Sequence, residues 1–401
     1  MKVLLVNAFD ERGGASIAAM RLHQSLSKED IENQFLVQFK LSKNQAVLSE
    51  TNFFLIFLNK ILSKLDALIG RILFRDVNNF SVAFFSSINI VNKINKLNPD
   101  IVHLHWTCNG MLSIEDIPKI QAPILWTMHD NWVFSGGCHN MSLCKDHQKQ
   151  TNKCGKYINY IHKRKMKAFR KKTDIYFLSL SSWLHDLAVK STLIGHRKNY
   201  HLPNPIDTKI YLPIQQSIAR KNFNLQNDKK IILFGALNAS SDKNKGLHLL
   251  FDVISKFKDD EIEIVIFGNN EPLAYQNFKF HNFGKIDNDQ TLNLLLNAGN
   301  VLVVPSLQEN FSNLILEGLA ASIPVAAFDV GGNKDLILHK ENGYLAQPFN
   351  SDDLKKGIDW ILGHESPKVL KENARNSVLL RFDSKKVARD YIQLYENILK
   401  S

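Results

Sequence analysis

The chain has 401 residues, of which 44% are hydrophobic and 22% charged, and its 19 glycines and 11 prolines are scattered along it. This composition excludes wholesale disorder, a collagen-like repeat and a disulfide-stapled miniprotein, and the length indicates two or three domains. Fifty Lys and Arg residues against 39 Asp and Glu residues give a net charge of +11, which favours an anionic partner such as a nucleotide, a nucleic acid or an anionic lipid.

The cysteines and the apolar segments indicate the compartment. All four cysteines lie between positions 108 and 154, a distribution that does not cross-link a secreted protein of this length, so we expect a reducing environment. The apolar run at the N-terminus is too short for an export signal. The stretch 53–74 contains Lys60, Lys64, Asp66 and Arg71, so we predict no transmembrane helix and a cytoplasmic protein.

Short runs rich in Val, Ile, Leu and Phe alternate with longer helical patterns along the chain. The strands expected in the first half are 2–8, 33–39, 100–106, 124–130 and 175–181. Those expected in the second half are 229–235, 262–268, 301–306 and 324–330. Strands that are apolar on both faces and alternate with helices predict parallel sheets. The expected fold class is therefore α/β, with two Rossmann-like, doubly wound domains.

The boundary between these domains is expected at Pro203 and Pro205, because two prolines so close remove backbone donors and disfavour helix before them. We place the linker at 203–210, which gives domains at 1–203 and 204–384. The segment 385–401 has an apolar stripe at helical spacing, so it predicts a terminal helix that packs against another part of the protein.

Two glutamates in the second half mark a candidate site. Glu309 follows the strand that ends at Ser306, and Glu317 lies two turns into the next helix. Ligands of open parallel sheets bind at this edge, where carboxylates can hold sugar hydroxyls and the free amides at a helix start can hold phosphate. The simpler interpretation is a helix with solvated carboxylates, of which the first complements the helix dipole.

Two further helix starts fit a phosphate-bearing ligand. Lys245 and Gly246 follow the strand at 229–235, where an ammonium group can reach a diphosphate. Gly13 and Gly14 follow the first strand and allow close approach of the backbone before a helix N-terminus. Each signal alone is weak, since a solvated lysine and a simple glycine turn look the same.

Taken together, the motifs resemble the retaining, nucleotide-sugar-dependent glycosyltransferases of family 4, which have the GT-B fold of two Rossmann-like domains facing across a cleft. The resemblance spans almost the whole chain and includes a last helix that crosses back onto the first domain. WTMHDNW followed by GGCH resembles a subgroup that includes exopolysaccharide-type transferases. The segments that carry the resemblance are 7–15, 100–106, 126–140, 202–211, 245–250 and 309–317.

The resemblance implies a role for each matching residue. The first domain would hold the acceptor and the second the donor. The implied catalytic residues are His129 and Glu309. The implied donor-binding residues are Gly14, Lys243, Lys245, Asn310, Phe311, Ser312 and Glu317, with Lys243 as a substitute for the arginine that the family usually has. The implied acceptor-side residues are His105 and Asp130, although a structural role is open for every histidine in this set.

Two groups of residues in the sequence are candidate metal ligands. Cys138, Cys144 and Cys154, with His139 and His147, could supply zinc ligands, but Tyr157 stands where related members have a further cysteine, so buried free thiols are the simpler interpretation. Asp287 and Asp289 resemble a divalent-ion pair but fit a helix start better. We expect no catalytic metal and no cofactor.

Two segments point toward a membrane surface. Nine Lys or Arg residues and no acidic ones lie between Lys153 and Lys172, in a helical pattern. In 53–74, polar residues recur at helical spacing opposite a wide apolar face, as in interfacial helices. Either segment could also be an ordinary solvated or core-facing helix. Together they indicate peripheral attachment to an anionic membrane surface as an option, at the inner face of the cell membrane.

These observations lead to one main hypothesis and two alternatives. The main hypothesis is a retaining glycosyltransferase of the hexosyltransferase type, which moves a sugar from a nucleoside diphosphate to a glycan acceptor, expected to be lipid-linked, in cell-surface polysaccharide synthesis. The alternatives are a nucleotide-sugar epimerase of the same fold and a non-catalytic scaffold that binds membranes or nucleic acid. We expect no nucleic-acid partner, because the glutamates, Lys245 and His129 are all present.

Overall fold

The computed structural model describes residues 1–73, 80–140, 153–237, 239–258, 262–269, 271–276, 278–286 and 288–401. Within this part the chain divides into two compact units. Unit 1 comprises residues 1–205 together with 385–401, and unit 2 comprises residues 206–384. Each unit has its own sheet and its own apolar core, so each is described by itself.

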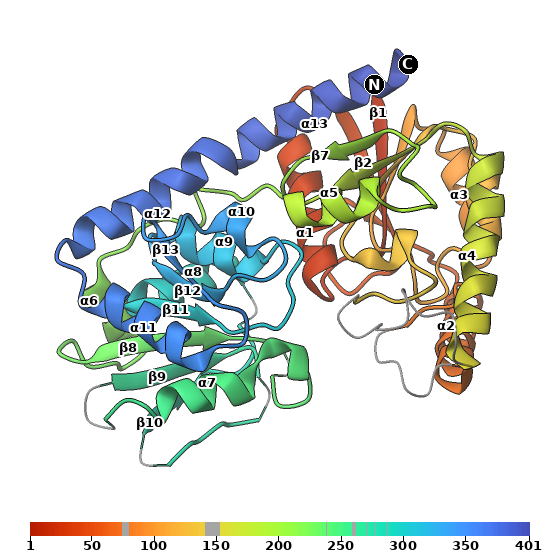
Figure 1. Cartoon of the computed structure of the whole chain (residues 1–401). Coiled ribbons are helices and arrows are strands. Elements are labelled where there is room, and N and C mark those ends of the chain that lie inside the picture. The colour runs from red at the N-terminus through yellow and green to blue at the C-terminus, as the bar shows by residue number, and fades with distance from the viewer. Residues whose placement is uncertain are drawn as a thin grey trace. The chain divides into compact units, whose positions relative to one another are not determined.

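Unit 1 is built on a seven-stranded parallel sheet in the order β3-β2-β1-β4-β5-β6-β7. Val3 to Val6 of the central strand are completely buried, because helices cover both faces of the sheet (Figure 1). The order reverses between β1 and β4, which makes this point the topological switch of the unit. The strands are β1 (Lys2–Phe9), β2 (Glu32–Phe39), β3 (Val47–Leu48), β4 (Ile101–Leu104), β5 (Ile124–Met128), β6 (Ile175–Ser179) and β7 (Asn199–His201).

The last helix of the chain packs against unit 1. Its stripe of Val387, Tyr391, Leu394 and Ile398 is buried, and the Tyr395 hydroxyl lies 2.7 Å from Nδ1 of His103 on β4. The helices of unit 1 are α1 (Gly14–Leu26), α2 (Phe53–Leu73), α3 (Ile90–Lys96), α4 (Lys153–Lys171), α5 (Ser182–Val189) and α13 (Ser384–Leu399), with the short 3-10 helices η1 (Ile114–Lys119) and η2 (Asn131–Phe134).

Unit 2 is built on a six-stranded parallel sheet in the order β10-β9-β8-β11-β12-β13, which reverses between β8 and β11. The strands are β8 (Lys230–Gly235), β9 (Ile262–Phe267), β10 (Lys279–Asn282), β11 (Val301–Val304), β12 (Val325–Phe328) and β13 (Gly343–Ala346). The helices are α6 (Gln216–Asn222), η5 (Lys243–Lys245), α7 (Leu247–Ile254), α8 (Asp289–Ala298), α9 (Asn313–Ala320), α10 (Asn333–Leu336), α11 (Ser351–Leu362) and α12 (Pro367–Arg381).

The predicted fold class of two doubly wound α/β domains is confirmed. Each of the nine expected strands is present, and among the residues that the structure describes the sequence analysis missed only β3, β7, β10 and β13. All four lie at the edges of their sheets. An edge strand is short and half solvated, so it lacks the continuous apolar run of a central strand. Within the described residues, no helix is both long and apolar enough to span a bilayer.

Candidate functional site

A pocket opens at the carboxyl ends of the central strands of unit 1. Its cavity of about 440 Å³ adjoins the loop after β1, where Gly13 has a left-handed φ of 85° and begins α1. Glycine is suited to this conformation because side chains rarely adopt it. Gly14, the first residue of α1, is exposed. The pocket is lined by Phe9, Arg12, Gly13, Gly14, Ala15, Ser16, Trp106, Asn109, His129 and Asp130.

His129 enters this pocket directly after β5. Burial lowers its pKa to about 4, although the Asp130 carboxylate opposes the shift, so the imidazole is neutral at pH 7. Nε2 of His129 lies 3.0 Å from Nδ1 of His105. Burial also lowers the pKa of His105 well below its usual value, so a single proton joins these two nitrogens.

His105 has a different place from the one expected. It is 3% exposed and lies behind His129, outside the residues that line the pocket, so the structure gives it the position of a supporting partner. Its ring is 4.3 Å from the ring of His103, which contacts Thr127 and Tyr395. A buried row of histidines thus connects the pocket with α13. The sequence motif DIVHLHW contained both histidines, but it did not show which way each side chain points.

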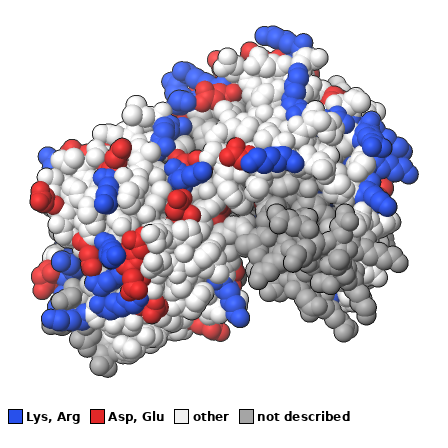
Figure 2. Space-filling model, in the orientation of Figure 1, with Lys and Arg blue, Asp and Glu red and all other residues white. Residues whose placement is uncertain are grey.

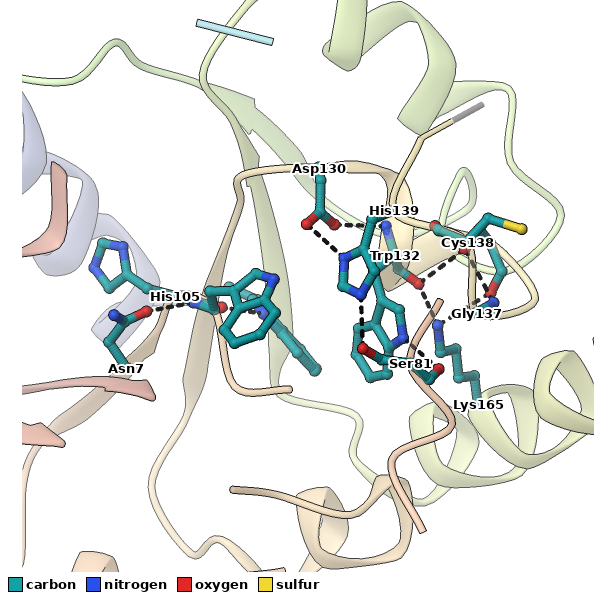
Figure 3. A network of polar contacts seen from close by, with 12 residues as sticks. Asn7, Ser81, His105, Asp130, Trp132, Gly137, Cys138, His139 and Lys165 are labelled. Atoms are coloured by element: carbon teal, nitrogen blue, oxygen red, sulfur yellow. Dashed lines mark hydrogen bonds and ion pairs between the residues drawn. The ribbon is translucent and has the colours of Figure 1, made fainter. Parts of the chain in front are cut away.

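Asp130 has both carboxylate oxygens engaged. Oδ1 accepts the Trp132 amide at 2.8 Å and caps η2, and Oδ2 lies 2.7 Å from Nδ1 of His139, whose other nitrogen contacts Ser81 (Figure 3). Burial favours the neutral acid, but His139 and the Trp132 amide outweigh it and hold the pKa of Asp130 below its usual value. Asp130 therefore lines the pocket while it fixes the loop that follows β5.

The cysteine block differs from the expectation of free thiols. Cys138 is 1% exposed and disulfide-bonded, whereas Cys108 is free. The buried Cys138 sulfur is shielded from thiols in solution, because thiol–disulfide exchange requires that an attacking thiolate can reach the sulfur. A sulfur in a disulfide offers no thiolate to zinc. Cys144, His147 and Asp287 lie outside the described residues, and in the described part of the chain no cluster of His, Cys, Asp and Glu could hold a metal.

In unit 2, the loops after β8 and β11 meet at the switch point of the sheet. Nζ of Lys245 lies 3.1 Å from Oε1 of Glu309, and the charge of Glu309 raises the pKa of Lys245. The Leu307 amide donates to the carbonyl of Asn244 at 2.8 Å, and the Asn244 side chain donates to Gln308 at 2.9 Å. The two loops are therefore held together by backbone contacts as well as by the ion pair.

Two glycines allow the backbone around these loops to pack closely. Gly246 has a φ of 69°, and a Cβ added to it would lie 1.9 Å from the carbonyl oxygen of Pro305. Gly331 has a φ of 56°, and its added Cβ would lie 1.8 Å from the carbonyl oxygen of Glu309. That same oxygen accepts the Gly332 amide at 3.0 Å. Glycine at both positions lets the backbone of the glutamate loop approach its neighbours closely.

Three of the remaining predicted residues of unit 2, Asn310, Phe311 and Ser312, lie directly before α9. The Ser312 hydroxyl caps the helix by accepting the Ile315 amide at 3.4 Å, and Phe311 packs on Phe382. Glu317 is 5% exposed, and Asn310 is half-buried beside Glu309. Lys243 is exposed on η5, one turn from Lys245. A helix start, two cations and the Glu309 carboxylate at one sheet edge can bind phosphates and hydroxyl groups.

Helix α2 gives unit 1 an exposed apolar surface. The buried side of helix α2 is polar: Asn59 accepts the Ile88 amide, and Asp66, whose pKa is raised by burial, accepts the Phe84 amide, both at 2.8 Å. Seven large apolar residues of the same helix face solvent. Their exposed fractions are Phe53 84%, Phe54 64%, Phe57 53%, Ile61 38%, Leu65 39%, Leu68 50% and Ile72 58%. An exposed stripe of this size marks an interaction surface.

Helix α4 carries fewer free cations than its sequence suggests. Arg164 donates to Glu115 at 2.7 Å and to the Val82 carbonyl at 2.8 Å, so it joins α4 to η1 and to the segment beside α2. Lys165 and Lys172 are buried. The exposed cations include Lys163, Lys167, Arg170 and Lys171. Figure 2 shows a cluster of Lys and Arg side chains on this side of unit 1. Side chains at 153–156 lie outside the described set.

Comparison with known sequences finds a family match within unit 2. Residues 215–377 match the family model of glycosyl transferases group 1. An uncharacterized glycosyltransferase of Methanocaldococcus jannaschii is 30% identical over 49% of this chain and 53% of its own length. The N,N'-diacetylbacillosaminyl-diphospho-undecaprenol alpha-1,3-N-acetylgalactosaminyltransferase of Campylobacter jejuni is 26% identical over the same shares. The chain thus spans about half the length of these relatives. WcaC of Escherichia coli, named for colanic acid biosynthesis, is 22% identical over 86% of both chains.

Solved structures share the fold over the full length. Sucrose-phosphate synthase of Thermosynechococcus elongatus superposes with a TM-score of 0.71 at 17% identity and covers 100% of this chain and 99% of its own. Anabaena HepE in complex with UDP-glucose superposes with a TM-score of 0.65 at 15% identity, over 99% of this chain and 100% of its own. The protein therefore has the GT-B fold, and its residues 215–377 match the family model of the group 1 glycosyl transferases.

Proposed function

We propose that this protein is a retaining glycosyltransferase that uses a nucleoside diphosphate sugar in polysaccharide biosynthesis. The observation that carries the proposal is the Lys245–Glu309 pair beside the start of α9, at the switch point of unit 2 and inside the matched segment 215–377. Relatives named for bacterial surface polysaccharides support the pathway class. Membership of family 4, and of its exopolysaccharide-type subgroup, is part of the proposal.

The donor is assigned to unit 2. Lys245 is protonated at neutral pH and supplies positive charge for the diphosphate, with Lys243 nearby and the amides of Asn310, Phe311 and Ser312 at the helix start. Glu317 holds the ribose hydroxyls and Glu309 the sugar. The complex of Anabaena HepE with UDP-glucose, on the same fold, supports a nucleotide sugar as the donor.

The proposed catalysis relies on charge stabilisation and on positioning of the reactants. Retention in this fold requires no protein nucleophile, so the leaving diphosphate takes the proton of the acceptor hydroxyl while Lys245 stabilises its charge. His129, neutral and fixed by His105, offers a ring nitrogen as a hydrogen-bond partner in the pocket of unit 1, which also holds Gly14 and Asp130.

The acceptor is proposed to be a glycan linked to a lipid through a diphosphate. The name of the Campylobacter relative describes such an acceptor. The exposed apolar stripe of α2 is proposed to contact an anionic bilayer. The exposed charged residues of this helix, Lys60, Lys64 and Arg71, are all positive, and its only acidic residue, Asp66, is buried. The protein is thus proposed to act as a peripheral protein at the inner face of the cell membrane.

The test is a panel of nucleotide sugars in a thermal-shift screen, followed by transfer to a diphosphate-linked lipid sugar. A binder at a hundredfold excess over its Kd stabilises the protein by about 2.7 kcal/mol. Transfer with retention of the anomeric configuration supports the proposal. Turnover of the donor without any acceptor would indicate an epimerase instead, and salt-sensitive binding of polynucleotides with no affinity for nucleotide sugars would indicate a scaffold.

A further inference from the structure

Unit 1 contains a second cavity that the donor chemistry does not use. Its volume is about 560 Å³, and it lies between β2 and α2. It shares Phe9, Arg12 and Asn109 with the pocket of His129, so the two cavities adjoin. A ligand that occupies this cavity can therefore reach toward His129 from within the same unit.

The lining of the second cavity is strongly cationic. Arg12, Lys40, Lys60 and Lys64 line it, and Glu50 is the one acidic residue among its lining groups. Oε1 of Glu50 already accepts the amides of Thr51 and Asn52, both at 2.9 Å.

In the described part of the chain no carboxylate lies within ion-pair distance of Arg12, Lys60 or Lys64, and Lys40 donates to the Val47 carbonyl at 3.1 Å. Four cations against one carboxylate favour an anionic ligand. Phosphate groups suit such a cluster, because hydrogen bonds between ionised partners are the strongest that side chains make.

The same cavity has an apolar side that leads to the stripe on α2. Phe9, Phe39, Leu41 and Ile56 line it together with the cations. Ile56, Lys60 and Lys64 recur every fourth residue, which places them on one side of α2. The exposed stripe that begins at Phe53 and Phe57 occupies the adjoining side of the helix. The lysines therefore stand at the boundary between the cavity and an exposed apolar surface.

We propose that this cavity binds the diphosphate of a polyprenyl-type lipid diphosphate, with Arg12, Lys60 and Lys64 as its ligands and the lipid chain directed along the apolar stripe of α2. The inference rests on the proposed function and deepens it, because it assigns a place to the charged part of the acceptor. It also explains why α2 carries lysines only on the side next to the cavity and buries its one carboxylate. A free phosphate compound would need the cations but not the stripe, so experiment can separate the two sources.

The test measures binding of farnesyl diphosphate, a water-soluble lipid diphosphate, to the full chain by titration calorimetry in the presence of excess UDP, which occupies diphosphate sites of unit 2. Farnesol and inorganic pyrophosphate are the comparison probes. We expect farnesyl diphosphate to bind more tightly than either. Equal affinity for farnesol would overturn recognition of the diphosphate, and equal affinity for pyrophosphate would overturn recognition of the lipid.

Variants locate the site. Lys60→Ala with Lys64→Ala removes two exposed cations of the cavity and should raise the Kd for farnesyl diphosphate about tenfold or more, because the diphosphate loses two charge-assisted hydrogen bonds. The control, Lys96→Ala with Lys190→Ala, removes two exposed lysines of unit 1 that are not among the lining residues and should leave the Kd unchanged. An unchanged Kd in the first variant overturns the proposal.

The same proteins distinguish this inference from the proposed function. Binding of UDP-sugars by the Lys60→Ala, Lys64→Ala variant should equal that of the unmodified chain. Loss of farnesyl diphosphate binding with intact nucleotide-sugar binding supports the cavity. Absence of nucleotide-sugar binding in the unmodified chain contradicts the proposed donor, and the result with farnesyl diphosphate then still decides the cavity by itself.

Discussion

Nε2 of His129 lies 3.0 Å from Nδ1 of His105, so the histidine that reaches the pocket is held from behind by a second, buried histidine. Both rings are neutral at pH 7, because burial lowers their pKa values. A neutral pair shares one proton, which fixes the tautomer and the orientation of His129 together. The supporting residue is thus part of the arrangement that presents the imidazole to a substrate.

His129→Ala should lower kcat by about a hundredfold, in the range of a lost hydrogen-bonding or acid–base group, with little change in Tm because the ring lies at the edge of a pocket. His105→Phe keeps the volume but removes the hydrogen bond and should lower kcat by less. Steady-state kinetics and thermal unfolding check both, with the exposed His196→Ala as the control. A His129→Ala protein that fails to fold would assign the residue a structural role.

Lys245→Ala should raise the Kd of the nucleotide-sugar donor about tenfold or more, because the diphosphate loses a protonated partner and Glu309 loses its counter-ion. Glu317→Ala should weaken donor binding in the same way, whereas Glu309→Gln should depress kcat more than affinity. Calorimetry and kinetics separate these effects. The exposed cation Lys368, in unit 2, provides the control Lys368→Ala. Unchanged affinity and rate in all three site variants would contradict the site.

Gly246→Ala should destabilise unit 2 and abolish donor binding, because the new Cβ would lie 1.9 Å from the Pro305 carbonyl oxygen. Gly284→Ala is the matched control: its φ of 60° is also left-handed, but the nearest atom to its Cβ is 4.0 Å away. The control should lose only about 1 kcal/mol of stability, the cost of the backbone conformation. Thermal unfolding and donor titration compare the two. Equal effects would show that the close contact is unimportant.

The free energy of unfolding should fall as the pH drops from about 6.5 to about 4. Burial lowers the pKa of His103 to about 3 and that of His129 to about 4, so in this window the unfolded chain binds protons that the native chain does not. Stability is then fully present above the unfolded pKa and is lost as the pH falls toward the folded pKa. Each histidine contributes a slope of at most about 1.4 kcal/mol per pH unit. Denaturant unfolding of the His103→Gln variant should show a shallower dependence.

Phe54→Ser with Phe57→Ser should release the protein from anionic vesicles, because it removes two of the exposed apolar side chains of α2. Val369→Ser with Leu380→Ser, exposed apolar residues of unit 2, should change nothing. Charge reversal of Lys163, Lys167, Arg170 and Lys171 should weaken binding and its sensitivity to salt, and Arg164 is left intact because it holds η1. Co-sedimentation measures each. Vesicle binding that is indifferent to both sets would leave α2 without this role.

The sequence by itself determined the central strands and the edge of each sheet where the candidate site residues lie. Strands such as Lys2–Phe9 and Val301–Val304 are buried on both faces, so their apolar runs are continuous and legible. Because His129 directly follows β5 and Glu309 lies in the loop after β11, the sequence predicted that both lie at the carboxyl edge of a sheet. The edge strands β3, β7, β10 and β13 were not predicted, because they are short and lack a long continuous apolar run.

Only the tertiary structure decided which face of each helix is covered. The periodicity of α2 placed Asn59 and Asp66 opposite Phe53 and Phe57, but it could not show that the polar side is the buried one, because that choice depends on backbone amides at 84–88 that come from another part of the chain. In the same way Arg164 is occupied by Glu115, 49 residues away in sequence. Periodicity records which residues share a face, whereas partners distant in sequence determine what that face meets.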